Sequence, residues 1–243
     1  TDRDYITMWS GNLLLTPLSG TGGSSQGTIS VSSGKWYYEC LLDTNTSMTG
    51  LSIGLCLATA LIGDTDIQNF VGEVADSWGY SPLDGKLWVG GVDTATYTLA
   101  VTGDIMQVAV DLDASKMWIG INNTWVNSGA PASGTNAIVT SGLIGDICPA
   151  ASISLASPWT VDWLRGLILN FGQDSSFTSN ETKQNNQDSN NIGDFYYTPP
   201  SGFLTMCTKN LPTPSIVLPV DHFNTALYTG TGIDGLSISG VGF

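Results

Sequence analysis

The sequence predicts an all-β protein, a sandwich of two antiparallel sheets. Short stretches alternate apolar and polar residues at a period of two, the pattern of strands with one buried face. Glycine is frequent, at 29 of 243 residues, and with many Ser, Thr and Asn residues it indicates tight turns between short strands. No segment carries a convincing apolar period of 3.6 residues, so helices are not expected.

The clearest strands lie at 106–112 and 117–121, where every second residue is apolar. Residues 113–116 predict a turn that folds the second strand back antiparallel on the first. Asn122 and Asn123 end the second strand, because asparagine tolerates the positive φ of a tight hairpin turn. Two strands with one apolar face each cannot stand alone in water, so this hairpin must pack on another sheet.

The chain before this hairpin predicts several elements in order. Residues 8–17 indicate an opening hairpin, and 19–27 a Gly/Ser loop. Residues 28–31 then lead into a turn. Residues 35–42 are apolar or aromatic on both faces, which predicts a central strand. Residues 51–57 alternate large apolar with small side chains, so a neighbouring layer can approach this core strand closely.

Between these strands and the end of the sandwich, turns and short strands are expected. Residues 62–85 lack clean alternation and should be mostly surface loop, except for 77–80, where Trp78 is expected to fill the core. Residues 130–142 are turn-rich, and 159–166 lengthen the link before the last long strand. Further strands are expected at 87–92, at 96–101, from 147 onward and at 167–171.

Four motifs resemble, in order, segments of the SPRY domain. They are GKWYYE at 34–39, SWGY at 77–80, GDIMQVAVDLDASKMWIGINN at 103–123 and NFGQ at 170–173. The resemblance implies a SPRY-like, concanavalin-like antiparallel β-sandwich with an extended C-terminal β appendage.

The predicted organisation has three parts. Residues 1–207 form the sandwich, within which 175–193 is an Asn/Gln-rich, solvated polar loop and 203–207 adds a last strand. Residues 208–220 form a proline-spaced connector. Residues 221–243 begin a second β unit or form an inter-subunit arm. Because the chain starts at Thr1 without an initiator Met, we expect a processed product or a fragment of a longer protein.

The C-terminal half resembles virion structural proteins of tailed, particularly marine, bacteriophages. The segments that carry this resemblance are FGQDSSF, IGDFYYTPPSGFLTMCTKNLPTPSI and HFNTALYTGTG. It implies a place on the phage particle surface, other virion proteins as partners, and a tail-fibre or spike module that recognises a host-surface glycan or protein. One alternative is a capsid or tail decoration protein that only packs on other virion proteins. Another is a cellular SPRY adaptor that binds peptides.

Charge and composition exclude several partners. A formal net charge of −14 argues against nucleic acid and against anionic lipid. No apolar run approaches the roughly 20 residues of a spanning helix, so membrane insertion is not expected. The four cysteines lack metal-site spacing, which favours buried free thiols over one disulfide.

The sequence predicts no enzyme and no cofactor. None of the three glutamates has an acidic residue two positions away, as a glycosidase pair on one strand would require. Asp111 and Asp113 have this spacing but fit the turn of the strand pair. His222 is the sole histidine and lies in the appendage, which leaves no Ser-His-Asp site in the sandwich. Asp64 and Asp66 could begin a calcium site, but no third ligand is in range, which favours a solvated acidic loop.

Binding remains the functional class to consider. Trp125, Trp159 and Trp163 are not explained by strand alternation, and an indole can stack on a sugar or on an apolar partner side chain. Local packing is the alternative for each. We also expect a homo-oligomer, a trimer joined mainly through the region after Leu211, because 221–243 has too few large apolar residues to bury a core alone.

Overall fold

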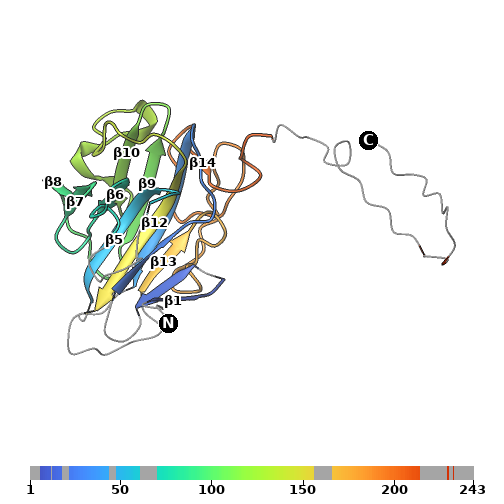
Figure 1. The fold of residues 1–243 in the computed structure, drawn as a ribbon, viewed down its shortest axis with the longest axis horizontal. Helices are drawn as coiled ribbons and strands as arrows, with labels where there is room; N and C mark the ends of the chain where they lie inside the picture. The colour runs from blue at the N-terminus through green and yellow to red at the C-terminus, as the bar shows by residue number, and fades with distance from the viewer. Residues whose placement is uncertain are drawn as a thin grey trace. The chain divides into compact units, whose positions relative to one another are not determined.

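The computed structural model describes residues 6–11, 13–17, 22–43, 48–60, 70–155 and 166–213, together with Thr229 and Gly232. The chain divides into two units, Thr1–Asn210 and Leu211–Phe243. The strands of the described residues all lie in the first unit and form two sheets (Figure 1).

The larger sheet has eight strands, with β4 at its centre. All its pairings among the described residues are antiparallel except that of β14, which runs parallel to β4. In spatial order the strands are β1 (Ile6–Trp9), β2 (Leu14–Pro17), β13 (Gly166–Asn170), β4 (Lys35–Asp43), β9 (Ile105–Asp111), β10 (Lys116–Ile121) and β11 (Thr124–Trp125), with β14 (Leu204–Thr205) beside β4.

The second sheet has six strands and is antiparallel throughout. Two short 3-10 helices, Val126–Ser128 and Pro131–Ser133, follow β11. In spatial order the strands are β3 (Gly22–Gln26), β12 (Ile147–Leu155), β5 (Met48–Leu57), β6 (Ser77–Tyr80), β7 (Lys86–Val89) and β8 (Val92–Thr96).

The two sheets pack closely over the core. Tyr38 of β4 is buried, and its hydroxyl donates to the Gly54 carbonyl of β5 at 2.6 Å, so it joins the layers. Gly54 permits a close approach within the second sheet, because a Cβ at this position would lie 2.0 Å from the Trp78 carbonyl oxygen. Trp78 itself is buried, as the sequence predicts. The alternation of large and small residues in β5 therefore lets its neighbours approach.

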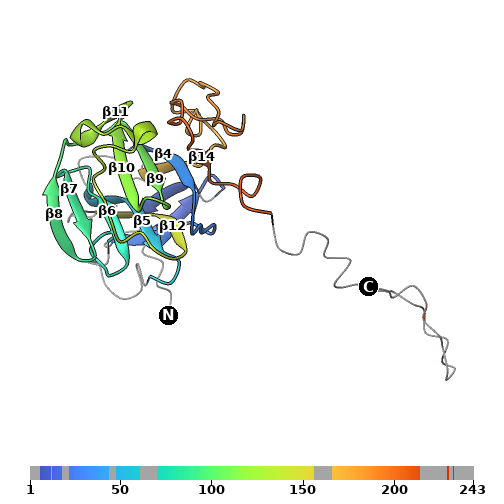
Figure 2. The ribbon, with the colours of Figure 1, turned by 90° about the horizontal axis from the view of Figure 1, so that it is seen from above.

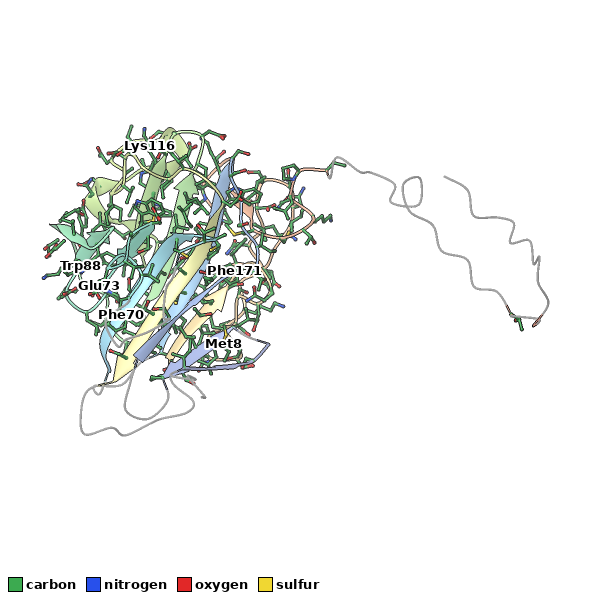
Figure 3. The ribbon with its side chains drawn as sticks, viewed as in Figure 1. Met8, Phe70, Glu73, Trp88, Lys116 and Phe171 are labelled. Carbon is green, nitrogen blue, oxygen red and sulfur yellow. The ribbon has the colours of Figure 1, made fainter. Side chains whose placement is uncertain are left out.

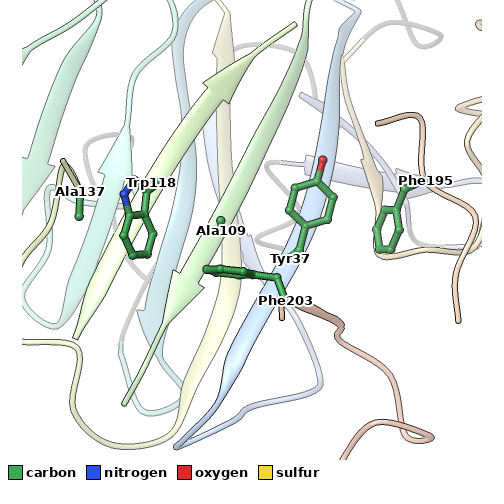
Figure 4. Packing of buried hydrophobic residues seen from close by; sticks show 6 residues of the cluster. All are labelled: Tyr37, Ala109, Trp118, Ala137, Phe195 and Phe203. Atoms are coloured by element: carbon green, nitrogen blue, oxygen red, sulfur yellow. The ribbon is translucent and has the colours of Figure 1, made fainter. Parts of the chain in front are cut away.

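The outer face of the larger sheet is also buried, which agrees with the two apolar faces of residues 35–42 but not with the mixed face predicted for 106–112. Every residue of β9 is buried, including Gln107 and Asp111 on its mixed face. The segment that follows β13 supplies the cover and lies on the side of this sheet away from β5 and β12 (Figure 2). Its rings pack into an aromatic cluster with the sheet, formed by Tyr37, Ala109, Trp118, Ala137, Phe195 and Phe203 (Figure 4).

The prediction of a solvated loop at 175–193 is therefore wrong in part. Its amide side chains are mostly exposed, but Ser175, Phe177 and Asp188 are buried. Phe177 packs on the sheet beside Leu14 and Ile168. A few aromatic residues thus anchor a polar segment, because each buries a large apolar area.

Other predictions are confirmed or corrected by the strand pairings. The opening hairpin, the central position of β4 and the β9–β10 hairpin are confirmed. Asn122 and Asn123 have φ of 48° and 62°, as their turn requires. The strand expected at 96–101 is wrong, because β8 ends at Thr96, and the strand expected at 203–207 is only the two residues of β14.

The predicted Gly/Ser loop at 19–27 is also corrected, because it contains β3. Backbone pairing with β12, with no apolar pattern of its own, defines this strand. Gly22 permits it, since a Cβ there would lie 2.2 Å from the Ser154 Cβ.

Candidate functional site

A groove lies where the margins of the two sheets meet. It has a volume of about 300 Å³ and is lined by β1, the turn after it, β3, β12 and the end of β13. Met8 and Phe171 mark it in Figure 3. A smaller hollow of about 170 Å³ shares Thr28, Pro149 and Phe171 with the groove and adds Ile29 and Met206.

The groove combines apolar side chains with a few polar ones. Leu13, Leu169 and the half-buried Phe171 provide apolar surface, and Ser25 and Thr28 provide two hydroxyls. The Ser25 hydroxyl lies 3.7 Å from the Met8 sulfur, so β3 and β1 approach each other at the groove. Among the described lining residues none is ionisable. Such a surface suits binding rather than proton transfer.

Asn170 determines where Phe171 lies. Its side-chain oxygen accepts hydrogen bonds from the backbone N–H groups of Gly172 at 2.9 Å and Gln173 at 3.0 Å, which closes the turn after β13. The Gln173 side-chain oxygen accepts the Phe171 N–H at 2.7 Å. The Phe171 ring then packs on Tyr38, with ring centroids 5.3 Å apart. The NFGQ motif is therefore the turn that positions one wall of the groove.

Glu39 fastens the covering segment to the outer face of the larger sheet. Its buried carboxylate accepts four hydrogen bonds, and each oxygen takes one backbone and one side-chain donor. Oε1 accepts the Tyr197 N–H at 2.7 Å and the Tyr37 hydroxyl at 2.9 Å. Oε2 accepts the Tyr196 N–H at 2.8 Å and the Asn170 amide at 3.1 Å. Through Asn170, this carboxylate is connected to the turn that carries Phe171.

Burial raises the pKa of Glu39 from 4.5 to about 7, and the four hydrogen bonds oppose this shift. A raised carboxyl pKa is also a property of catalytic acids. Here both oxygens are fully occupied by protein donors, and the side chain has no exposed surface. Glu39 is therefore a structural carboxylate.

The other acidic candidates in the described residues are also structural. Asp111 forms an ion pair with Lys35 at 3.1 Å and accepts the Ala114 N–H at 3.0 Å, and Asp113 accepts the Gly34 N–H at 3.0 Å. Both act in the turn, in agreement with the sequence interpretation. No group of three or more His, Cys, Asp or Glu residues suited to a metal ion occurs within the described ranges.

Of the three tryptophans predicted as binding residues, the structure describes one. Trp125 is half-buried in β11, packs against the aromatic cluster and is not among the residues that line the groove. Trp159 and Trp163 lie outside the described residues, as do Asp64 and Asp66. Their proposed roles in binding stay predictions.

All four cysteines are free thiols, and Cys40, Cys56 and Cys148 are buried, as the sequence favours. Cys56 and Cys148 lie directly opposite each other on β5 and β12, with sulfur atoms 3.4 Å apart. In the described part of the chain no helix is long and apolar enough to cross a membrane.

Sequence reasoning did not find the groove. Its wall residues come from segments that are far apart in the chain, and most have side chains without obvious chemistry. One signal was present, because Phe171 follows a strand within the recognised NFGQ motif. Its neighbour Asn170 could have indicated a fixed turn, since asparagine side chains bond the backbone just after them.

Comparison with known proteins places the fold. A family model described as the SPRY domain matches residues 35–157. The SPRY domain of human HERC1 is 17% identical, with a TM-score of 0.50, and the alignment covers 69% of this chain and 95% of that one. A second human SPRY domain is 15% identical, with a TM-score of 0.48, over 68% of this chain and 94% of that one. The comparison with curated proteins found no match. The matched family range ends before β13, so Phe171 and the covering segment lie outside it.

Proposed function

The chain belongs to the SPRY domain family, and from this premise we propose that it is a non-enzymatic recognition module on the surface of a tailed-phage particle. SPRY domains are protein-interaction modules and are generally not catalytic. The finer proposal is a tail-fibre or spike component that contacts the host surface. The resemblance of the C-terminal half to virion structural proteins supports the phage setting.

The observation that carries the proposal is the groove. It is concave, it contains no ionisable side chain among its described lining residues, and it combines an aromatic ring with hydroxyl groups. Ligand sites in proteins have this composition, mostly apolar with a few polar groups that orient the ligand. The acidic groups described above are engaged in structural hydrogen bonds, which leaves binding as the activity that this surface supports.

The test is adhesion of the full chain to candidate host bacteria. Beads densely coated with the protein are mixed with a panel of marine bacteria, since multivalent display makes weak single contacts measurable. Thr28→Trp places an indole in the groove, because exposed Thr28 lines both hollows. Thr140→Trp adds the same ring at an exposed position outside the groove and is the matched control. We expect specific adhesion that Thr28→Trp abolishes and Thr140→Trp preserves.

A decoration protein that packs only on other virion proteins is the second candidate. It is favoured by the acidic composition, which keeps a densely arrayed surface protein soluble. Absence of adhesion to every strain, combined with binding to purified particles that lack the protein, would replace the first proposal with this one.

A further inference from the structure

We propose that the groove binds an uncharged glycan through a pyranose ring stacked on Phe171. This inference rests on the proposed recognition function and specifies the ligand class for the same site. It follows from the charge, the chemistry and the size of the groove.

Charge selects against ionic ligands. The chain carries a net charge of −14, so anionic sugars such as sialylated or sulfated glycans are repelled as they approach. An amino sugar would bring a cation, but no carboxylate is among the described residues that line the groove. A charge placed there would lose solvation without gaining a partner. The favoured ligand is therefore neutral.

The distribution of apolar and polar groups matches a sugar ring. A pyranose has faces of C–H groups and a rim of hydroxyls. Phe171 is half-buried and held against Tyr38, so it offers a fixed aromatic surface to one such face. Ser25 and Thr28 also line the groove, and their hydroxyls can bond the hydroxyl rim of such a ring. The Ser25 side chain points toward Met8 of β1 across the groove, whereas the Gln26 side chain points to the other face of β3, where it bonds Ala58 and Cys56.

The size of the groove favours a short oligosaccharide segment. Its volume of about 300 Å³ lies at the lower end of the range for small-ligand sites. The adjoining hollow of about 170 Å³ shares the Phe171 wall, so a second sugar unit has a place beside the first. Together they point to two linked neutral sugars.

The experiment begins with the full chain, multivalently displayed, on a glycan array with neutral, sialylated, sulfated and amino-sugar members. A neutral oligosaccharide identified there is then titrated by calorimetry against single variants. Phe171→Leu retains an apolar side chain but removes the ring, and Ser25→Ala removes a hydroxyl of the groove. Ser201→Ala removes the same type of group from an exposed position outside the groove and is the control.

We expect neutral glycans to bind and charged ones not to bind. Phe171→Leu should weaken binding about 10-fold, the upper range for one aromatic contact, and Ser25→Ala should weaken it several-fold. Ser201→Ala should bind as the unaltered protein does. Thermal unfolding of each variant shows whether the fold is retained. If Phe171→Leu fails to fold, Thr28→Trp provides the same test by occlusion.

Three results would overturn the inference while leaving recognition intact. The first is array binding confined to charged glycans. The second is binding of neutral glycans that neither Phe171→Leu nor Thr28→Trp weakens. The third is adhesion to cells that is abolished by protease treatment and survives periodate oxidation of surface sugars, which indicates a protein receptor. If neither cells nor any glycan bind, the proposed recognition function fails together with the inference.

Discussion

Replacing Glu39 with glutamine is the most informative single change in the sandwich. The substitution preserves size and shape and removes the ability to carry a negative charge. Glu39 has no exposed surface, and its two oxygens each accept one backbone N–H and one side-chain donor. A glutamine amide can accept on one side only. Whichever way it turns, the N–H of Tyr196 or Tyr197 faces another donor.

The loss of stability expected for Glu39→Gln at low pH follows from the number of buried donors left without an acceptor. A protonated glutamate can direct its single proton toward the Tyr37 oxygen and still accept from its other neighbours, whereas an amide nitrogen accepts nothing. One buried backbone N–H is then left without a partner, which costs about 1–3 kcal/mol. At pH 4.5 we therefore expect Glu39→Gln to unfold more easily by about 2 kcal/mol.

The pH dependence has a definite sign. The folded-state pKa of Glu39 is raised from 4.5 to about 7, so the unfolded chain releases its proton first as the pH rises. The contribution of Glu39 to stability is complete below pH 4.5 and declines until about pH 7, by about 3 kcal/mol. Tyr37 and Tyr197 also face this carboxylate, but burial raises the pKa of each, so neither titrates in this range. Glutamine does not titrate, so the variant lacks this decline.

The assay is urea unfolding of both proteins at several pH values from 4.5 to 8. The free energy of unfolding of Glu39→Gln relative to the unaltered protein should rise by about 3 kcal/mol across this range. All other titrating groups cancel in the difference. If the difference in the free energy of unfolding does not change with pH, the argument that burial outweighs the hydrogen bonds in setting the pKa of Glu39 is refuted. If the difference falls as the pH rises, the folded protein favours the carboxylate form.

Three further predictions concern other parts of the molecule. Oxidation with glutathione disulfide should join Cys56 and Cys148, whose sulfur atoms are 3.4 Å apart, with release of two glutathione thiols. Peptide mass spectrometry should find this cross-link and no other. Two unmodified thiols after prolonged oxidation would contradict the prediction. Gly54→Ala should lower the free energy of unfolding by about 2 kcal/mol or more, because the added methyl group would lie 2.0 Å from the Trp78 carbonyl oxygen. Urea unfolding measures this change. An unchanged unfolding midpoint would show that β5 and β6 separate freely to make room for the methyl group. Light scattering of the full chain should give the mass of a trimer, whereas light scattering of a protein that ends at Asn210 should give the mass of a monomer. Equal oligomeric states would exclude residues 211–243 as the assembly element.

Part of the fold was predictable because it depends on local patterns. The β9–β10 hairpin shows this most clearly, since alternating side chains define its inner face and Asn122 and Asn123 supply the positive φ of the turn that ends β10. The NFGQ and SWGY motifs likewise lie where the resemblance places them, at the end of β13 and in β6. The phage setting, the trimer and the roles of Trp159 and Trp163 stay predictions.

Other elements were missed because their own residues do not determine them. The sequence of β3 is GGSSQ, which has no apolar face, and it becomes a strand because β12 offers backbone partners. The segment 175–193 is polar on average, yet Phe177 is buried on the sheet. Average polarity predicts exposure, but one ring in the right place can anchor a whole polar segment.

The sequence by itself determined the strand pattern, the sandwich and the SPRY family, because these depend on periodicity and on motifs a few residues long. Only the tertiary structure decided that the segment after β13 covers the outer face of β4, that Glu39 is a buried acceptor for Tyr196 and Tyr197, and that Phe171 shares a groove with Ser25. These contacts join residues more than a hundred positions apart. Their energies depend on burial and on the direction of donors, and both are properties of the folded chain.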